Sequence, residues 1–284
     1  MKLTSEQVKG RIRNVAKQNN TDARILMRLY MMERFLERVS VSQYKDKFVI
    51  KGGMLVTAMV GVALRTTMDI DTTIKNHDLS EEEAKHIVNE IAQINIDDGV
   101  TFEIKDMSTI MDNMEYPGIR FTMNAIMEKL ITPMKIDIST GDVITPRAIE
   151  YRYKLILEDR SINLWSYNLE TILAEKLQTI LSRGLLNTRM RDLYDIRTLV
   201  SVYGEDISTD TLKCAFEATC KKRKTENLKL DANDILTKIN IDDHIQQLWK
   251  AYQKKYTYAA SISYEDTIES IEILLNRILE YYSS

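Results

Sequence analysis

The stretch FVIKGGMLVTAMVGVALRTTMDIDTTI, residues 48–74, decides the fold of this chain. Its opening residues 48–50 are apolar, which predicts a short buried strand. Gly52 and Gly53 interrupt that strand, and the apolar run 54–62 that follows has the length of a helix. Glycines at the start of a helix allow backbone N–H groups to approach a phosphate at the positive end of the helix dipole. The glycine pair is therefore a candidate phosphate-binding turn.

A second strand closes the stretch. After a predicted polar turn at 65–67, residues 68–71 read MDID. Side chains in a strand alternate between faces, so Asp69 and Asp71 project from one face. Two neighbouring carboxylates repel each other and favour a cation between them, and Mg²⁺ is commonly held by one or two carboxylates together with substrate phosphates. A surface strand that simply carries acidic residues gives the same pattern, so the pair alone leaves both interpretations open.

A third carboxylate comes from a later strand. Residues 134–139 read MKIDIS, and their alternation places Lys135, Asp137 and Ser139 on the outer face. Asp137 is the candidate that would complete a metal-binding set with the first two aspartates. An outward Lys–Asp pair on an exposed strand is the alternative explanation.

The second half of the chain places a lysine on the packed face of a helix. From about residue 165 the pattern is almost entirely helical, and Asn168 is a candidate cap for a helix that ends before Gly184. At about 100° per residue, Lys176 falls inside the apolar stripe of that helix. Its ammonium group could extend to the rim of the packed face, or it could bind a nucleotide phosphate as a charged clamp.

Charged residues crowd the helix that follows, where residues 189–197 read RMRDLYDIR. Asp192 lies within the apolar side of this helix and Asp195 at its margin. An aspartate in the first turn of a helix is explained by capping. The arrangement contains more charge than a cap requires, so a functional role stays open beside the structural one.

Four motifs in one order resemble those of the AbiEii-type nucleotidyltransferases, the toxin half of bicistronic abortive-infection toxin–antitoxin systems of bacteria. They are Gly52-Gly53 with Asp69-x-Asp71, Lys135-x-Asp137, Lys176, and Asp192-x-x-Asp195. The resemblance spans roughly residues 23–200. This sequence departs from the family at Gly53, where members often have serine. The hydroxyl group is lost there, but the backbone amide that could bind a phosphate remains.

The resemblance implies an α+β fold, with a nucleotidyltransferase-type mixed β-sheet core, N-terminal helices and a C-terminal helical domain. We accordingly expect a nucleotidyltransferase domain at 1–160 and a helical domain at 161–284, which would contribute Lys176 and Asp192 to the cleft. Apolar residues at helical spacing predict further helices in both parts. These are 8–18, 23–39, 213–222, 241–254 and 263–282.

The resemblance also implies roles for individual residues. The metal-binding set is Asp69, Asp71 and Asp137, which would hold one or two Mg²⁺ ions at the triphosphate of an NTP. The nucleotide-binding set is Gly52, Gly53, Lys176 and Asp195. The catalytic set is Asp69, Asp71, Asp137, Lys135 and Asp192. Within it, Asp137 or Asp192 is the candidate general base, and Lys135 would orient either one.

Composition limits the classes of protein to which the chain can belong. Among 284 residues, 44% are hydrophobic and 29% are charged, which is typical of a soluble globular protein. The net charge is −3, so any contact with nucleic acid must come from a local basic face. Neither an apolar run of membrane-spanning length nor the apolar core of a signal peptide is present. Two cysteines, six residues apart, and three scattered histidines do not form a zinc motif, and a reducing cytoplasm fits best.

The partners follow from the resemblance more than from the residues. It implies an NTP substrate, with GTP among the candidates, an RNA acceptor such as the 3′ end of tRNA, and a cognate antitoxin with or without direct binding. Basic residues that could track a phosphate backbone cluster at 9–17 and at 221–224, although solvated helix faces look the same. Two alternatives stay open: a non-catalytic nucleotide-binding regulatory module, and nucleotidyl transfer to a protein or a small molecule.

Overall fold

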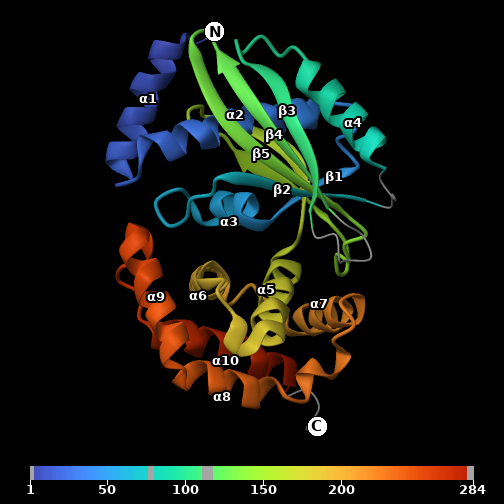
Figure 1. Ribbon diagram of the computed structural model, residues 1–284, viewed down its shortest axis with the longest axis vertical. Coiled ribbons are helices and arrows are strands. Elements are labelled where there is room, and N and C mark those ends of the chain that lie inside the picture. Colours follow the sequence, from blue (N-terminus) through green and yellow to red (C-terminus); the bar gives the residue numbers. More distant parts are fainter. Residues whose placement is uncertain (1–2, 76–79, 111–117, 280–284) are drawn as a thin grey trace. The chain divides into compact units, whose positions relative to one another are not determined.

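The computed structural model describes residues 3–75, 80–110 and 118–279 (Figure 1). The chain divides into two compact units. The first comprises Met1–Asp142 and Ala148–Tyr167, and the second comprises Val143–Arg147 and Asn168–Ser284. The first unit therefore includes residues 161–167, which the predicted boundary after residue 160 had assigned to the helical part.

A seven-stranded mixed sheet forms the first unit, with the strand order β3-β4-β5-β2-β1-β7-β6. The strands are β1 Phe48–Lys51, β2 Asp69–Ile74, β3 Thr101–Ile110, β4 Gly118–Met127, β5 Leu130–Thr140, β6 Ile149–Lys154 and β7 Ser161–Ser166. β2 is antiparallel to β1 and parallel to β5, while β1 is parallel to β7. The predicted α+β class with a mixed sheet is confirmed.

Among the described residues of this unit, the α-helices are α1 Ser5–Gln18, α2 Ala23–Val41, α3 Gly52–Val60 and α4 Glu81–Gln93. α1 begins at a capping box in which Thr4 and Gln7 bond reciprocally, and α2 begins where Asp22 accepts a hydrogen bond from the amide of Arg24. α2 buries its apolar stripe and packs against β5 and β7. α2 therefore covers one face of the sheet with apolar side chains. The polar side chains of β2 and β5 project from the opposite face.

Two predictions within the first unit are corrected by the structure. The segment 65–67, predicted as a polar turn, is not a turn in the structure, and all three of its residues are buried, with Arg65 0% exposed. The side chain of Arg65 donates a hydrogen bond to the backbone oxygen of Thr66. In addition, β6 and β7, for which no strands were predicted, extend the sheet beyond β1.

The second unit is helical, as predicted. Its α-helices are α5 Leu169–Arg183, α6 Met190–Tyr203, α7 Thr209–Lys222, α8 Ala232–Ile241, α9 Asp243–Lys255 and α10 Tyr264–Leu279. The predicted helix 241–254 is α9, which begins where Asp242 accepts a hydrogen bond from the amide of Ile245. α10 packs against α6, α7 and α8, so its apolar stripe is core; residues 280–282 of the predicted helix lie outside the described residues. In the described part of the chain, no helix combines the length and apolarity needed to cross a membrane.

A buried glutamate ties α2 to the loop between β6 and β7. Glu33 is 1% exposed, and it accepts hydrogen bonds from the amide of Ile156 at 3.1 Å and from the hydroxyl of Tyr153 at 3.3 Å. Burial raises the pKa of Glu33 from its ordinary 4.5 to about 8, because removal from water penalises the charged carboxylate. Between about pH 4.5 and 8 this shift favours the protonated carboxyl group in the folded protein and the ionised one in the unfolded chain.

We predict that Glu33→Gln removes a pH dependence of stability. A raised carboxyl pKa contributes stability that is fully present below about pH 4.5 and is lost as the pH rises towards 8. The expected slope is at most about 1.4 kcal/mol per pH unit for one proton. Chemical denaturation of wild type and variant, at several pH values across this window, should show the variant gaining relative stability as the pH rises. A constant difference between the two proteins across the window would contradict a raised pKa at Glu33.

Candidate active site

A row of four charged residues crosses the middle of the sheet. On neighbouring strands β1, β2, β5 and β4, Lys51 is paired with Asp71, Asp71 with Asp137, and Asp137 with Arg120. Residues in register on adjacent strands project from the same face. The row therefore reads positive, negative, negative, positive, and we call these four residues the charge row.

Asp69 lies two residues before Asp71 on β2, on the same face. Both are partly exposed, while Ile70 between them is fully buried, as the alternation of β2 requires. Asp69 is in register with Lys135 on β5, which is exposed. The structure thus brings the three predicted metal-binding aspartates to adjacent positions on two parallel strands.

The glycine pair fits closely against Asp71. Gly52 has a φ of +58°, and a Cβ atom at this position would lie 2.3 Å from Oδ2 of Asp71. The amide of Gly53 donates a hydrogen bond to the same oxygen at 3.1 Å. Only glycine combines this backbone conformation with such a close approach. The start of α3 is therefore held directly against the carboxylate.

Gly53 also has no room for a side chain such as that of serine. A Cβ atom there would lie 2.7 Å from Oγ1 of Thr67. The side chain of Thr67, which comes from the buried segment 65–67, occupies the space that a serine would need. Glycine at position 53 is thus the residue that fits beside Thr67.

Burial raises the pKa of Asp71 above its ordinary value. The negative charges of Asp137 and Asp69 act in the same direction, while the Gly53 amide and the charge of Lys51 oppose the rise. A carboxylate in this environment favours a nearby cation. The site is accordingly electronegative around Asp71, and it is flanked by one basic residue on each side.

Arg120 is a site residue that the sequence reasoning missed. Its Nε donates to Oδ1 of Asp137 at 2.7 Å and its Nη2 donates to Oδ2 at 2.6 Å, which is a bidentate ion pair. The sequence contains part of the information needed to find Arg120. Apolar and polar residues alternate along 119–127, which places Arg120 on the polar side of β4. The residue across from it could be identified only from the register of β4 with β5.

Lys51 was missed as well. Its ammonium donates to Oγ of Ser139 at 2.7 Å and to a carboxylate oxygen of Asp142. The hydroxyl of Tyr167 donates to the same oxygen of Asp142 at 2.7 Å. Asp142 and Tyr167 are the two positions at which the chain leaves the first unit. Lys51, which precedes the glycine pair, is therefore bonded to Asp142, and Tyr167 donates to the same carboxylate.

The predicted residues of the second unit form a buried triad. Nζ of Lys176 on α5 lies 2.8 Å from Oδ1 of Asp192 and 2.7 Å from Oδ2 of Asp195, both on α6. Arg189 also pairs with Asp192, at 2.6 Å. Burial disfavours the charged lysine, but the two carboxylates outweigh this effect and raise its pKa. Lys176 is therefore on the packed face, as predicted, and its ammonium is bound by the two aspartates.

The donor set on the sheet suits a hard divalent cation in its chemistry, because carboxylate oxygens are the ligands that Mg²⁺ prefers. In the arrangement described for residues 3–75, 80–110 and 118–279, however, no three acidic, imidazole or thiol groups are placed to hold a metal ion together. Asp69 and Asp71 fit such a site by residue type and by their shared face of β2. Asp137 fits by residue type and position, while its carboxylate is engaged by Arg120.

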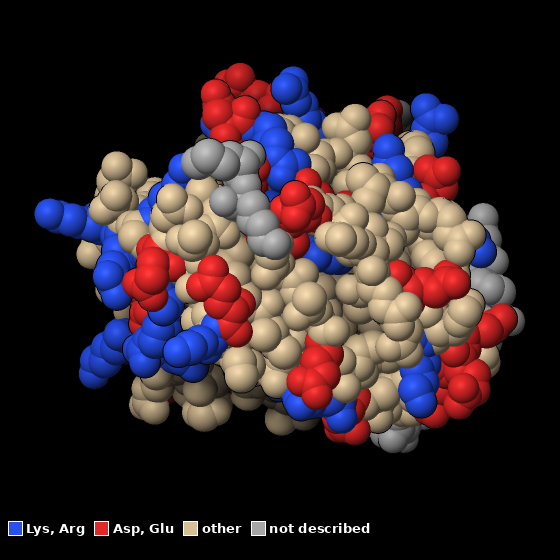
Figure 2. Space-filling view, turned by 90° about the horizontal axis from the view of Figure 1, so that it is seen from above, with Lys and Arg blue, Asp and Glu red and all other residues tan. Residues whose placement is uncertain are grey.

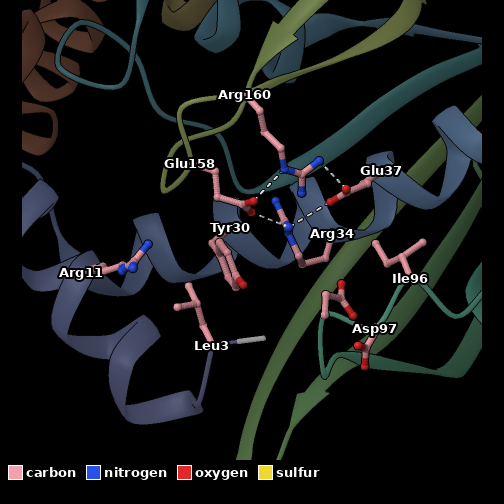
Figure 3. Close-up of a pocket in the computed structure, with 10 residues that line it drawn as sticks. Leu3, Arg11, Tyr30, Arg34, Glu37, Ile96, Asp97, Glu158 and Arg160 are labelled. Atoms are coloured by element: carbon pink, nitrogen blue, oxygen red, sulfur yellow. Dashed lines mark hydrogen bonds and ion pairs between the residues drawn. The ribbon is translucent and has the colours of Figure 1, made fainter. Parts of the chain in front are cut away.

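A separate cavity of about 470 Å³ in the first unit shares no lining residue with the charge row. It is lined from α1, α2, the loop before β3 and the loop between β6 and β7 (Figure 3). Arg34 in its wall is 2.8 Å from Glu158 and 2.9 Å from Glu37, and Glu37 also pairs with Arg160. These four side chains pair with one another, so the wall of the cavity carries an ion-pair network beside α2.

The two predicted basic clusters differ in their surroundings. On α1, Arg11, Arg13 and Lys17 are exposed. In the 221–224 cluster, Arg223 is bound inside its own unit, where Nη1 donates to Gln178 at 2.5 Å and to Thr179 at 2.9 Å. Figure 2 shows basic and acidic side chains interspersed over the face that it displays, with the densest group of Lys and Arg at one side.

Comparison with known proteins gives one family and two solved structures. The family model described as nucleotidyl transferase AbiEii toxin, type IV toxin–antitoxin system, matches residues 34–274. A candidate nucleotidyltransferase from Helicobacter pylori is 17% identical, with 91% of this chain and 96% of that chain covered and a TM-score of 0.48. JHP933 from Helicobacter pylori is also 17% identical, with 91% and 94% covered and a TM-score of 0.47. A search of curated protein sequences finds no match.

Proposed function

Because the chain belongs to the AbiEii nucleotidyltransferase toxins of type IV toxin–antitoxin systems, as its motifs predicted, we propose that it transfers an NMP group from an NTP to an RNA acceptor. The observation that carries this proposal is the close assembly of the glycine pair with Asp71, beside Asp69 and Asp137. It joins a phosphate-binding turn to a cluster of carboxylates on one face of the sheet.

In the proposed reaction, an acceptor hydroxyl oxygen forms a bond to the α-phosphorus of the NTP. The bond from that phosphorus to the oxygen that bridges to the β-phosphate breaks, and pyrophosphate leaves. The hydroxyl proton passes to a carboxylate, for which Asp137 and Asp192 are the candidates. Lys135, which is in register with Asp69, would orient the acceptor or the base.

Asp69, Asp71 and Asp137 would hold Mg²⁺, which when bound neutralises charge on the transferred and departing phosphates. The start of α3 would supply the other part of phosphate binding, because the amides at Gly52 and Gly53 lie at the positive end of that helix. The Gly53 amide would exchange its hydrogen bond to Asp71 for one to a phosphate oxygen. The close packing of Gly52 against Asp71 would keep phosphate and carboxylates at a constant separation. Preorganisation of this kind lowers the cost of reaching the transition state.

We propose that Lys176, Asp192 and Asp195 act on the nucleotide from the second unit. Support comes from the order of the motifs and from the charged state of Lys176, which its two carboxylate partners favour. A lysine that stays charged while it is buried can neutralise the β- and γ-phosphates. In this role Lys176 would exchange part of its contact with Asp192 or Asp195 for contact with phosphate oxygens.

The acceptor that we propose is the 3′ end of tRNA, where an added nucleotide would block aminoacylation and stop translation. The exposed basic residues of α1 support contact with a phosphate backbone better than the 221–224 cluster does, because Arg223 has partners within its unit. A cognate antitoxin follows from the family, and the cytoplasm, where tRNA and NTPs are found, is the proposed location.

The test is incubation of the purified full chain with each NTP labelled at the α-phosphate, together with Mg²⁺ and total RNA. We expect label to enter RNA of tRNA size from at least one NTP. Label on a protein or a small molecule would instead support the alternative acceptors. NTP binding without transfer to any acceptor would favour the non-catalytic module, and would overturn the proposed activity.

A further inference from the structure

Arg120 is the cation that this structure places within the carboxylate cluster. Its two hydrogen bonds to Asp137 use both oxygens of that carboxylate, at 2.7 and 2.6 Å. The pKa of Arg120 is raised, first by its hydrogen bonding to Asp137, against some loss of hydration, and then by the negative charges of Asp137, Asp69 and Asp71. Arg120 is thus the direct ion-pair partner of Asp137.

In its present geometry Asp137 directs one lone pair of each oxygen at this guanidinium group, so a divalent cation that needs the same side of the carboxylate competes with it. Mg²⁺ demands near-octahedral coordination by oxygen, whereas the bidentate pair directs both carboxylate oxygens at the planar fork of the arginine. A guanidinium group and a divalent cation at adjacent positions would also repel each other. Within the described residues, no set of three ligand groups is ready for a metal.

We propose that Arg120 competes with the divalent cation for Asp137, and that it leaves Asp137 to bind phosphate oxygens of the nucleotide when the metal is loaded. This inference rests on the proposed nucleotidyltransferase function. The side chain of Arg120 is 36% exposed, so it can change position without disturbing the core. Its five donors match phosphate oxygens as well as carboxylate oxygens.

The consequence is that metal and nucleotide bind cooperatively. Without nucleotide, the metal must displace a bidentate ion pair and leave the guanidinium group without an anion. With nucleotide, the displaced guanidinium group gains a triphosphate partner, so the cost of displacement falls. Arg120 is in this sense a positioning residue that links metal occupancy to the presence of substrate.

The experiment measures Mn²⁺ binding, as a probe of the Mg²⁺ site, from the electron paramagnetic resonance signal of free Mn²⁺. The full-length protein is used, first without nucleotide and then with a non-hydrolysable NTP analogue. We expect Arg120→Gln to bind Mn²⁺ at least about tenfold more tightly than wild type without nucleotide, because the metal then displaces no charge-assisted hydrogen bonds, each of which corresponds to about a tenfold change in an equilibrium constant. The analogue should tighten Mn²⁺ binding more in wild type than in the variant.

A matched control is Arg152→Gln, which removes the same charge from an exposed position on β6 of the same sheet. Its affinity for Mn²⁺ should equal that of wild type. Arg120→Lys keeps the charge and loses the bidentate fork, so its affinity should lie between those of wild type and Arg120→Gln. This order separates competition for the carboxylate from a general change in charge.

Two outcomes would overturn the inference in distinguishable ways. If wild type binds Mn²⁺ and Asp69→Asn abolishes that binding, but Arg120→Gln binds no more tightly than wild type, Arg120 does not compete and the metal site stands. If no variant binds Mn²⁺ even with the analogue, the three aspartates are not a metal site, and the proposed function fails together with the role of Arg120.

Discussion

Asp69→Asn is expected to reduce nucleotidyl transfer by at least about 10²-fold to 10³-fold, the range observed when one group that stabilises transition-state charge is removed. Asp69 is partly exposed at the start of β2, on the same face as Asp71. Asparagine keeps the size of the side chain and removes only the charge that would hold the metal. The rate should therefore fall while the thermal unfolding temperature stays close to that of wild type.

The matched control for this variant is Asp106→Asn, which removes the same charge from an exposed position on β3. Transfer from α-labelled NTP to RNA, measured for both variants at saturating Mg²⁺, should fall only for Asp69→Asn. Toxicity on expression in a bacterial host should be lost in parallel. Near-wild-type transfer by Asp69→Asn would remove Asp69 from the metal set.

Strand alternation explains why so much of the carboxylate cluster could be predicted. In 68–71 and 134–139 the apolar residues occupy every second position, so Asp69, Asp71 and Asp137 had to share the polar faces of their strands. The observed burial of Ile70 and Ile136 follows the same alternation. A pattern with a period of two is local, and it can be read without knowing which strands are neighbours.

Lys51 and Arg120, the two basic ends of the charge row, could not be predicted from strand alternation, because their place depends on sheet order and register. Lys51 and Arg120 become site residues only because β1 and β4 lie on either side of the β2–β5 pair, in a particular register. Sheet order and register are set by contacts between residues far apart in sequence, so local patterns do not contain them. Residues 65–67 show the same limit, since a short polar run became buried support for the glycine turn.

β6 and β7 were missed for a physical reason. β6 reads IEYRYK, and only one of its six residues, Tyr153, is fully buried. A strand at the edge of a sheet has little apolar surface to bury, and its alternation is correspondingly weak. The predicted boundary at 160 fell between these two strands, because charge and turn residues dominate the pattern there. Most helices of the second half were easier, since they bury a full apolar stripe, but α8 buries only Ala232, Leu236 and Ile239 and was not predicted.

Lys176→Met is expected to destabilise the second unit by about 3–5 kcal/mol, the range for removing one partner of a buried ion pair. Asp192 and Asp195 are 3% and 0% exposed, and both would lose the ammonium group that they share. Lys176 and Arg189 hold the pKa of Asp192 low against the effect of burial. The stability from that low pKa is present above the ordinary value of 3.8 and is lost as the pH falls through the folded value.

The measurement is chemical denaturation followed by far-ultraviolet circular dichroism near neutral pH and near pH 4. The difference between wild type and Lys176→Met should be smaller at the lower pH, because protonation neutralises carboxylates that the variant leaves without their lysine. Lys238→Met, which removes an exposed lysine from α8, should change stability little at either pH. Equal stability of Lys176→Met and wild type would show that the triad does not support the helical unit.

Structural and catalytic roles of Lys176 can then be separated with a compensated variant. Lys176→Met combined with Asp192→Asn and Asp195→Asn removes the buried charges together, and should recover much of the lost stability. If that folded variant transfers no NMP, the triad acts on the nucleotide as proposed. If it transfers NMP at the wild-type rate, Lys176, Asp192 and Asp195 are structural, and phosphate binding belongs to the glycine turn and the charge row alone.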